Sequence, residues 1–412
     1  MISSSTLNAT STKPKKPIHY FARAAALAIP ALLIGCQILG WVAALRSPVL
    51  YRYLADFREF YVVGTMLRDG HRAEIYQRIP TLATASAVIA PGSNSPQFSH
   101  PAYEALVFVP LAFLPIHAAF LVWLGVQMAL LLVACRVLRP QLTQFSELGL
   151  PLLMAMIGFY PVLFAMFQGQ DSLVVLLLLV CALNFVKRNA LFLAGFIIGF
   201  GVFRFQLLLP IVLLFTAWRL FALVGGFLLS TAACFLVSVA VAGLHGQMDL
   251  IHELQSLTAP NNFRGLTMPN LRGLIAGLRG GIDSPGLTVA GSVIVLAIAW
   301  GVGRRRECAD KFLLSVIASC LVSYHFFGHD LSLMIFPLLA LINSAFEGRN
   351  YYVLALLATL LSLPLALTMN GMPGWMNGAV PFGAFILACA FTPQRASLGR
   401  ESPPGFALEA AT

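Results

Sequence analysis

Residues 220–243 read LFALVGGFLLSTAACFLVSVAVAG and contain no charged side chain. About 20 apolar residues in an α-helix span the hydrocarbon of a bilayer, so this stretch predicts a transmembrane helix. The whole 412-residue chain has a similar character, with 59% hydrophobic and 10% charged residues. A soluble fold cannot hide so much apolar surface, and lipid must be the main solvent. We therefore expect an all-α polytopic membrane protein.

Apolar runs lie on both sides of this stretch. They occur at 21–45, 102–115, 116–138, 146–167, 171–186, 190–206, 207–218, 288–303, 311–325, 331–346, 351–370 and 377–392. Together they predict about 11–13 hydrophobic segments, several of them shorter than the length that spans a bilayer. Short or broken helices at membrane depth are tolerated only beside protein or a water-filled cavity. We therefore expect several broken helices inside the fold.

The net charge of +10 comes from basic residues between the apolar runs. A nucleic-acid site would need them clustered on one exposed face. Under the positive-inside rule, they instead mark the cytoplasmic side. The marks are Lys13, Lys15, Lys16, Arg136, Arg139, Lys187, Arg188, Arg219, Arg304–Arg306, Lys311, Arg349 and Arg395. All of these residues fall on the cytoplasmic side only if residues 102–115 do not cross the membrane. We therefore expect this run to be re-entrant or interfacial.

The first run, 21–45, is longer than the core of a signal peptide, which favours a retained anchor with the amino terminus in the cytoplasm. We expect one transmembrane domain over 21–395 in the cell (inner) membrane. Disordered cytoplasmic segments would flank it at 1–20 and 396–412. The two long outer loops would be 46–101 and 244–287.

Polar side chains near the membrane gather on the outer side of this topology. The outer turns carry Gln168, Gln170, Asp171, Arg204, Gln206, His325, His329 and Asp330. Ionisable groups at this depth are costly and indicate a functional site. The sequence therefore predicts one cavity that opens outward, toward the periplasm or the exterior.

The segment from Asp56 to Gly70 predicts an amphipathic interfacial helix, with Phe57, Phe60 and Leu67 on one face. Asp56 followed three residues later by Glu59 resembles a capping box. A carboxylate at the mouth of a cavity is also well placed to take a proton. Both roles stay open for Asp56.

A buried Arg204 needs an anion, either a protein carboxylate such as Asp171 or Asp330, or a phosphate. His325 and His329 have a spacing that could hold a metal if helical, but Gly328 favours a turn. There is no HExxH, no nucleotide-binding loop and no CxxC pair among the seven cysteines. We expect neither a metal nor another cofactor, and no disulfide framework.

Several short motifs resemble those of one family, and their order is the stronger signal. They are Asp56-Phe57-Arg58-Glu59-Phe60-Tyr61 followed by Gly64, Leu67, Gly70 and Tyr76, then Pro101, Gly169-Gln170-Asp171-Ser172-Leu173, Arg204-Phe205-Gln206-Leu207, Met268-Pro269-Asn270-Leu271-Arg272-Gly273-Leu274 and His329-Asp330-Leu331. From about residue 22 to 392 the chain resembles glycosyltransferase family 87. These are GT-C membrane enzymes related to polyprenyl-phosphate-mannose-dependent mannosyltransferases. Ser99-His100-Pro101 departs from the family's usual Tyr-Pro-Pro.

The resemblance implies a GT-C fold and a hexosyltransferase that moves mannose or a similar hexose or pentose. The donor would be a polyprenyl phosphate, and the acceptor a lipid or glycan hydroxyl at the outer face. Asp56 would be the general base of an inverting single displacement, and Arg204 would stabilise charge on the leaving phosphate. The implied substrate-binding residues are Glu59, Tyr61, His100, Gln170, Asp171, Arg204, Gln206, Asn270, Arg272, His329 and Asp330.

Two other functions are compatible with the same hydropathy. One is a transporter or flippase of a lipid-linked sugar, and the other is a non-catalytic assembly subunit. Alternating-access transporters often contain inverted repeats and need gates on both sides. This sequence has no halves of matching pattern and few polar residues facing the cytoplasm, which disfavours transport.

Overall fold

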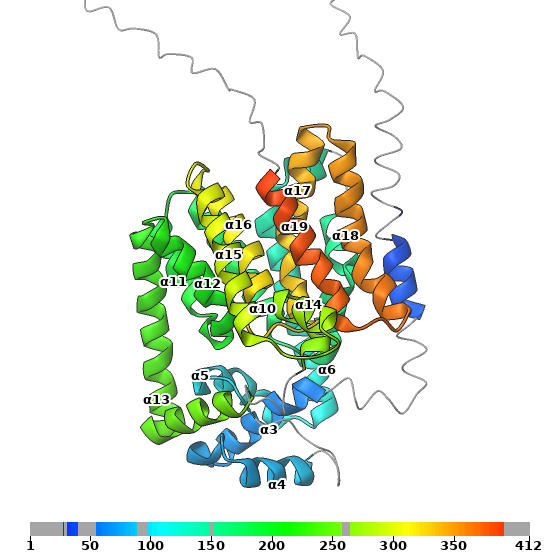
Figure 1. The fold of residues 1–412 in the computed structure, drawn as a ribbon. Helices are drawn as coiled ribbons and strands as arrows, with labels where there is room; N and C mark the ends of the chain where they lie inside the picture. Colours follow the sequence, from blue (N-terminus) through cyan, green and yellow to red (C-terminus); the bar gives the residue numbers. More distant parts are fainter. Residues whose placement is uncertain are drawn as a thin grey trace, which may run out of the picture.

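The computed structural model describes residues 28, 31–39, 55–88, 98–147, 151–257 and 264–390. All regular secondary structure in these ranges is helical, which confirms the predicted all-α class (Figure 1). The predicted arm 1–20 and tail 396–412 lie outside the described residues. So do parts of the first apolar run and of both outer loops.

Within the described residues, five helices are long and apolar enough to cross a membrane. They are α6 (Ile116–Leu138), α13 (Phe221–Leu257), α15 (Pro285–Gly303), α17 (Ile335–Glu347) with the preceding η8 (Asp330–Met334), and α18 (Tyr351–Met369). A sixth candidate is a bent pair, α11 (Leu191–Gly199) and α12 (Phe205–Ala217), whose axes meet at 75°. This confirms a polytopic membrane fold with a broken helix at the predicted place.

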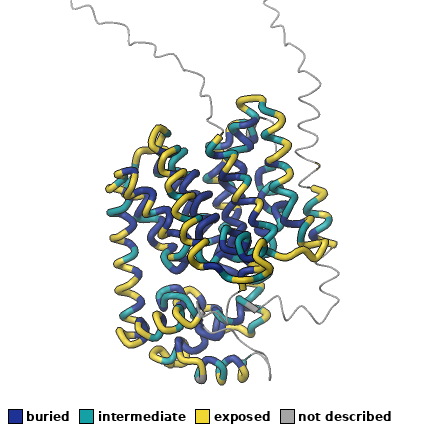
Figure 2. Tube along the Cα trace, in the orientation of Figure 1, coloured by how far each residue is buried: buried dark blue, intermediate teal, exposed yellow. Residues whose placement is uncertain are grey.

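Shorter helices complete the bundle. They are η4 (Arg139–Gln141), α7 (Thr143–Glu147), α8 (Leu152–Gly158), α9 (Tyr160–Gln168), α10 (Ser172–Lys187), η5 (Val202–Arg204), η7 (Gly265–Thr267), α14 (Leu271–Leu278), α16 (Cys308–Val322), η9 (Gly374–Gly378) and α19 (Ala379–Ala390). Most of α10 and α16 is buried in the middle of the bundle (Figure 2). Because other helices surround them, these short helices need not span lipid themselves.

A second layer closes one end of the bundle (Figure 1). It contains α3 (Ala55–Arg68), η1 (Arg72–Glu74), α4 (Arg78–Val88), α5 (Ala102–Ala105), η2 (Leu106–Phe108), η3 (Leu111–Phe113) and the second half of α13. Gly243 interrupts α13 with φ +74°, and there the chain turns from the bundle into this layer. Residues 102–115 form three short helical turns, so this run does not cross as one helix, in agreement with the topology expected from the basic residues.

The predicted apolar residues of α3 are buried, with Phe57 and Phe60 in the core of the second layer. The polar Arg58 and Thr65 are buried as well, so protein encloses most of this helix. The capping-box interpretation is wrong. The helix begins at Ala55, so Asp56 lies inside its first turn. Glu59 Oε1 accepts a hydrogen bond from the Ser99 N–H at 3.3 Å. The Glu59 side chain therefore braces the approach to α5.

Helices α11 and α13 approach each other closely through glycines. A Cβ on Gly195 would lie 1.8 Å from the Leu223 carbonyl oxygen, and one on Gly199 would lie 2.6 Å from that of Phe227. No side chain fits in either space, so the packing needs glycine. This contact holds the short helix α11 directly before the break at Arg204.

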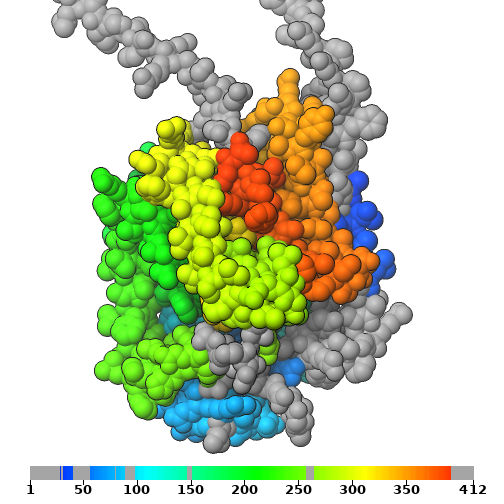
Figure 3. Space-filling model, in the orientation of Figure 1, coloured from blue at the N-terminus to red at the C-terminus, as the bar shows by residue number. Residues whose placement is uncertain are grey.

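The outer faces of the bundle are apolar, with exposed Leu229 and Leu236 on α13 and exposed Val293 and Ile294 on α15. Such faces fit a lipid environment. The α15–α16 turn, which begins with Arg304, and the α17–α18 turn lie at the end of the bundle opposite α3 (Figure 1). In the space-filling view the α14 segment lies above the α3–α4 layer, at its junction with the bundle (Figure 3).

Candidate functional site

Arg204 lies at the break between α11 and α12 and is buried. Its Nε donates to Asp171 Oδ1 at 2.9 Å, and its Nη2 donates to both Asp171 Oδ1 and Gln170 Oε1. Nη1 lies 3.6 Å from Asp330 Oδ1. The predicted partners Asp171 and Asp330 are therefore both present, and protein carboxylates balance this guanidinium.

The break itself is held by Tyr103 on α5. Its hydroxyl donates to the Phe200 carbonyl at 2.8 Å and accepts from the Phe203 N–H at 3.1 Å. Backbone groups left without helical partners are thus satisfied by a side chain. The tyrosine links the second layer to the position of Arg204.

Gln170 and Asp171 are placed by a tight turn after α9. Gly169 ends that helix with φ +70°, and a Cβ there would lie 2.6 Å from Cβ of Phe57. The turn is fixed by the Trp123 indole, which donates to the Gly169 carbonyl at 2.8 Å, and by Gln127, which donates to the Gln170 carbonyl at 3.0 Å. Phe57 therefore brings the start of α3, which carries Asp56, against this turn.

Asp330 begins η8 and accepts from Ser172 Oγ at 3.2 Å and from the Phe327 N–H at 3.0 Å. His329 Nε2 lies 3.4 Å from Asp330 Oδ2, and His329 Nδ1 is paired with Gln168 Oε1 at 3.0 Å. Residues 323–329 form no helix, so His325 and His329 lack the helical spacing that a metal pair would need. His329 instead joins the Arg204 group through Asp330.

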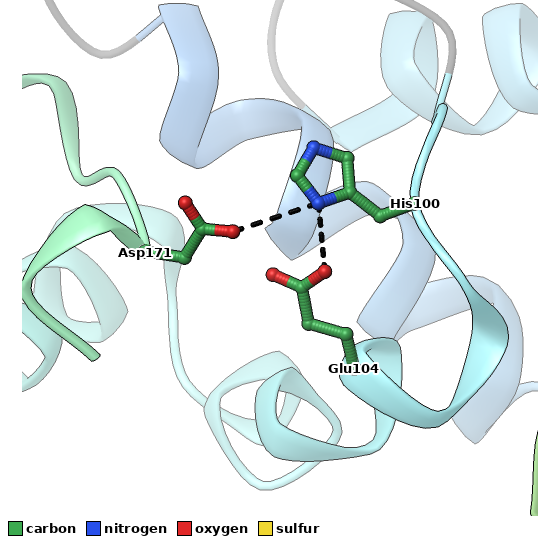
Figure 4. Close-up of side chains that lie close together, drawn as sticks. All are labelled: His100, Glu104 and Asp171. Atoms are coloured by element: carbon green, nitrogen blue, oxygen red, sulfur yellow. Dashed lines mark hydrogen bonds and ion pairs between the residues drawn. The ribbon is translucent and has the colours of Figure 1, made fainter. Parts of the chain in front are cut away.

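His100 joins the group from the other side (Figure 4). Its Nδ1 lies 2.7 Å from Glu104 Oε2 and 3.5 Å from Asp171 Oδ2. Burial lowers the pKa of His100. Burial, together with the nearby Asp171, raises the pKa of Glu104 well above its usual value. The arrangement is thus a buried set of proton-binding groups around one imidazole.

Glu59 connects this set to Asp56. Burial raises the pKa of Glu59 to about 8, while the nearby His100 lowers it and Asp56 raises it. Glu59 also accepts the N–H of Ser99, the residue before His100, and His100 in turn lies 3.5 Å from Asp171. The structure therefore gathers Glu59, His100, Gln170, Asp171 and Arg204 in one region. Asp56 lies beside it, half-buried.

Asn270 and Arg272 form a separate group. Asn270 caps α14 by accepting the Gly273 N–H at 2.9 Å, and donates to the Ser323 carbonyl at 2.6 Å. Arg272 pairs with Asp283 at 2.6 Å and lies 3.8 Å over the Tyr324 ring. Both residues brace the 323–329 turn from outside, and these contacts do not join them to Arg204.

Two further predicted residues have other surroundings. Tyr61 donates its hydroxyl to the Leu114 carbonyl at 2.6 Å and so ties α3 to the end of the 102–115 segment. Gln206 is half-buried in the first turn of α12. The described contacts give neither residue a direct hydrogen bond to the Arg204 group.

A family model of glycosyltransferase family 87 matches residues 98–324, more than half of the chain. The chain belongs to glycosyltransferase family 87. It is therefore a membrane glycosyltransferase, which disfavours the transporter alternative. No curated protein and no solved structure matches it. The matched region contains His100, Asp171 and Arg204, whereas Asp56 and Asp330 lie outside it.

Sequence reasoning missed one member of the site of this glycosyltransferase. Glu104 is buried and contacts His100 from one helical turn later. The signal was a single carboxylate four residues after His100 at the start of an apolar run. An ionisable side chain at this depth is costly in lipid, so a lone glutamate there predicts a buried polar partner.

Proposed function

We propose that this chain transfers a sugar from a polyprenyl-phosphate donor to an acceptor hydroxyl by an inverting single displacement. The observation that carries the proposal is the placement of buried Arg204 at a helix break, beside the layer that carries Asp56. A lipid-linked donor keeps its tail in the bilayer and its phosphate at the interface. A cation fixed at a broken helix suits such a phosphate.

Arg204 retains capacity for a phosphate oxygen. Its Nε and Nη2 groups serve Asp171 and Gln170, while Nη1 lies 3.6 Å from Asp330, beyond hydrogen-bond range. Among the described residues, no hydrogen bond occupies Nη1. A phosphate that approaches there gains a donor without displacing the Asp171 pair.

Asp56 is the proposed general base. It would take the proton of the acceptor hydroxyl, whose oxygen attacks the anomeric carbon. The bond from that carbon to the phosphate oxygen breaks, and the electron pair leaves with the lipid phosphate, next to Arg204. Glu59, with a pKa of about 8, is mostly protonated at neutral pH and suits the role of base less well.

The same arrangement supports a proposed orientation in the membrane. The turns that carry Arg304 and Arg349 lie at the end of the bundle away from the α3 layer. With basic turns in the cytoplasm, the site faces the periplasm or exterior. This orientation fits a lipid or glycan acceptor outside the cell membrane.

The test is sugar transfer by purified full-length protein from a panel of polyprenyl-phosphate sugars, with wild type and Asp56→Asn compared. Loss of a general base costs about 10²–10⁴ in rate, and we expect a decrease of that order. Asp69→Asn is the matched control, because Asp69 directly follows the same helix, is exposed and pairs with Arg68. Near-normal turnover of Asp56→Asn would exclude it as base. Absence of transfer by the isolated wild type would favour the assembly-subunit alternative.

A further inference from the structure

Three potential metal ligands meet where the second layer joins the bundle. His100, Glu104 and Asp171 each offer one ligand atom, and these atoms all lie within 4.8 Å of one another (Figure 4). His100 Nδ1 is 2.7 Å from Glu104 Oε2 and 3.5 Å from Asp171 Oδ2. Metal–ligand bonds of about 2.1 Å put neighbouring ligands about 3.0–3.4 Å apart. The observed separations bracket that spacing.

Two carboxylate oxygens in this group have no hydrogen-bond partner among the described residues. They are Glu104 Oε1 and Asp171 Oδ2, on side chains whose residues are only 4% and 2% exposed. Figure 4 shows the second oxygen of Glu104 on the side that faces Asp171. A buried carboxylate oxygen without a donor is costly, so either a proton shared between Glu104 and Asp171 or a bound cation should satisfy these oxygens.

The charge balance points the same way. Asp171 and Asp330 supply two buried carboxylates beside the Arg204 guanidinium, and Glu104, once a bound cation displaced its proton, would add a third. Asp171 uses Oδ1 for Arg204 and leaves Oδ2 directed at His100. A divalent cation on Oδ2 would offset the excess negative charge, and the Arg204 contact could remain.

The three ligands are held by rigid surroundings. The His100 ring lies between Phe98 and Phe203, with centroid distances of 5.7 and 6.5 Å and nearly parallel planes. Glu104 projects from α5, and Asp171 directly precedes α10. Ligands fixed in advance bind a metal without paying to order flexible side chains.

We propose that His100, Glu104 and Asp171 bind one divalent cation of the manganese class beside Arg204. One imidazole with two carboxylates mixes the nitrogen donor that suits transition metals with the oxygen donors that suit Mn²⁺ and Mg²⁺. This differs from the sequence-based expectation that no metal is bound. On the proposed function, the ion would add positive charge near the leaving phosphate.

The test is Mn²⁺ binding by purified full-length protein, followed by electron paramagnetic resonance of the free ion, first without any sugar donor. We expect wild type to bind one Mn²⁺, with Mg²⁺ a weaker competitor. Glu104→Gln, nearly equal in size, should weaken binding at least about tenfold, since even an outer substitution at a metal site costs that much. Glu74→Gln is the matched control, because Glu74 also contacts a histidine, His71, at 3.2 Å, but this pair lies at the surface. It should bind as wild type does.

Glu104→Asp keeps the carboxylate but shortens it, and covers the case in which Glu104→Gln does not fold. It should bind Mn²⁺ more weakly than wild type and more tightly than a folded Glu104→Gln. Absence of Mn²⁺ binding by wild type, or equal binding by wild type and Glu104→Gln, would overturn the proposal and favour a proton shared between Glu104 and Asp171. If sugar transfer continues after a chelator has removed divalent cations, the proposed glycosyl transfer stands and the ion has no role in it. Binding of Mn²⁺ without transfer from any polyprenyl-phosphate donor would instead contradict the proposed donor and leave the metal site standing.

Discussion

Arg204 and Asp171 are 33 residues apart in the chain, yet the guanidinium Nε donates to Asp171 Oδ1 at 2.9 Å inside the bundle. The pair connects the break between α11 and α12 to the turn before α10. Since α10 is short and the α11–α12 candidate span is broken at Arg204, helix length alone does not fix the depth of either residue. The pair therefore sets the geometry of the candidate site as well as its charge.

Replacing Arg204 by lysine keeps the charge and removes the planar fork. A lysine ammonium cannot donate hydrogen bonds to Asp171, Gln170 and a phosphate in the fixed planar geometry of the guanidinium. We therefore expect the rate of sugar transfer to fall at least tenfold and the melting temperature to decrease. The measurement is initial rate against donor concentration, with thermal unfolding of the same samples. Arg304→Lys, at an exposed position over Trp300, should change neither. Wild-type rates in Arg204→Lys would show that a point charge suffices there.

Gly169→Ala tests the contact between Phe57 and the Gly169–Asp171 turn. Gly169 has φ +70°, and a Cβ there would lie 2.6 Å from Phe57. Gly371 has φ +64° with nothing within 4 Å of a Cβ, so Gly371→Ala reports backbone strain alone. We expect about 1 kcal/mol of destabilisation at Gly371 and about 2–4 kcal/mol at Gly169, with loss of transfer only in the latter. If chemical unfolding gave the same loss of unfolding free energy for both variants, the Phe57 side chain would move aside without a measurable energetic cost.

The variant Asn270→Ala tests whether Asn270 has a structural role or binds the substrate. Asn270 is fully buried, caps α14 and also holds the Ser323 carbonyl. Asn350 caps α18 through the Val353 N–H at 3.2 Å and is the matched control. We expect about 1 kcal/mol of destabilisation for Asn350→Ala and about 2–3 kcal/mol for Asn270→Ala. If Asn270 only braces the turn, the donor KM of Asn270→Ala stays at the wild-type value. A large rise in that KM with normal stability would return it to the substrate site.

Much of the fold could be predicted from the sequence because lipid imposes simple rules on length and charge. The break at Arg204 and the failure of residues 102–115 to cross as one helix follow from them. Helical periodicity predicts the apolar face that contains Phe57, which is buried. The partners of Arg204 were also predicted, since a buried cation needs an anion. The grouping of Glu104 with His100 was not, because their spacing alone does not reveal that Asp171 lies opposite. The contacts of Asn270 with Ser323 and of Arg272 with Asp283 were not predicted for the same reason, because motif order carries no information on which turn a side chain faces.

The last prediction concerns acid stability and His325. Burial, and then the positive charge of Arg272, lower the pKa of His325 to about 4, against opposite effects of Asp330 and Asp283. The unfolded chain takes up the proton near the ordinary value of 6.5, so stability falls as the pH drops from about 6.5 toward 4. His325→Gln cannot bind this proton, and its melting temperature should fall less than that of wild type over the interval. The measurement is thermal unfolding at pH 7.5 and at pH 4.5. His245→Gln, at an exposed position paired with Asp249, should follow the wild-type decrease. Parallel curves for wild type and His325→Gln would show that His325 gains its proton in the folded state as readily as in the unfolded chain.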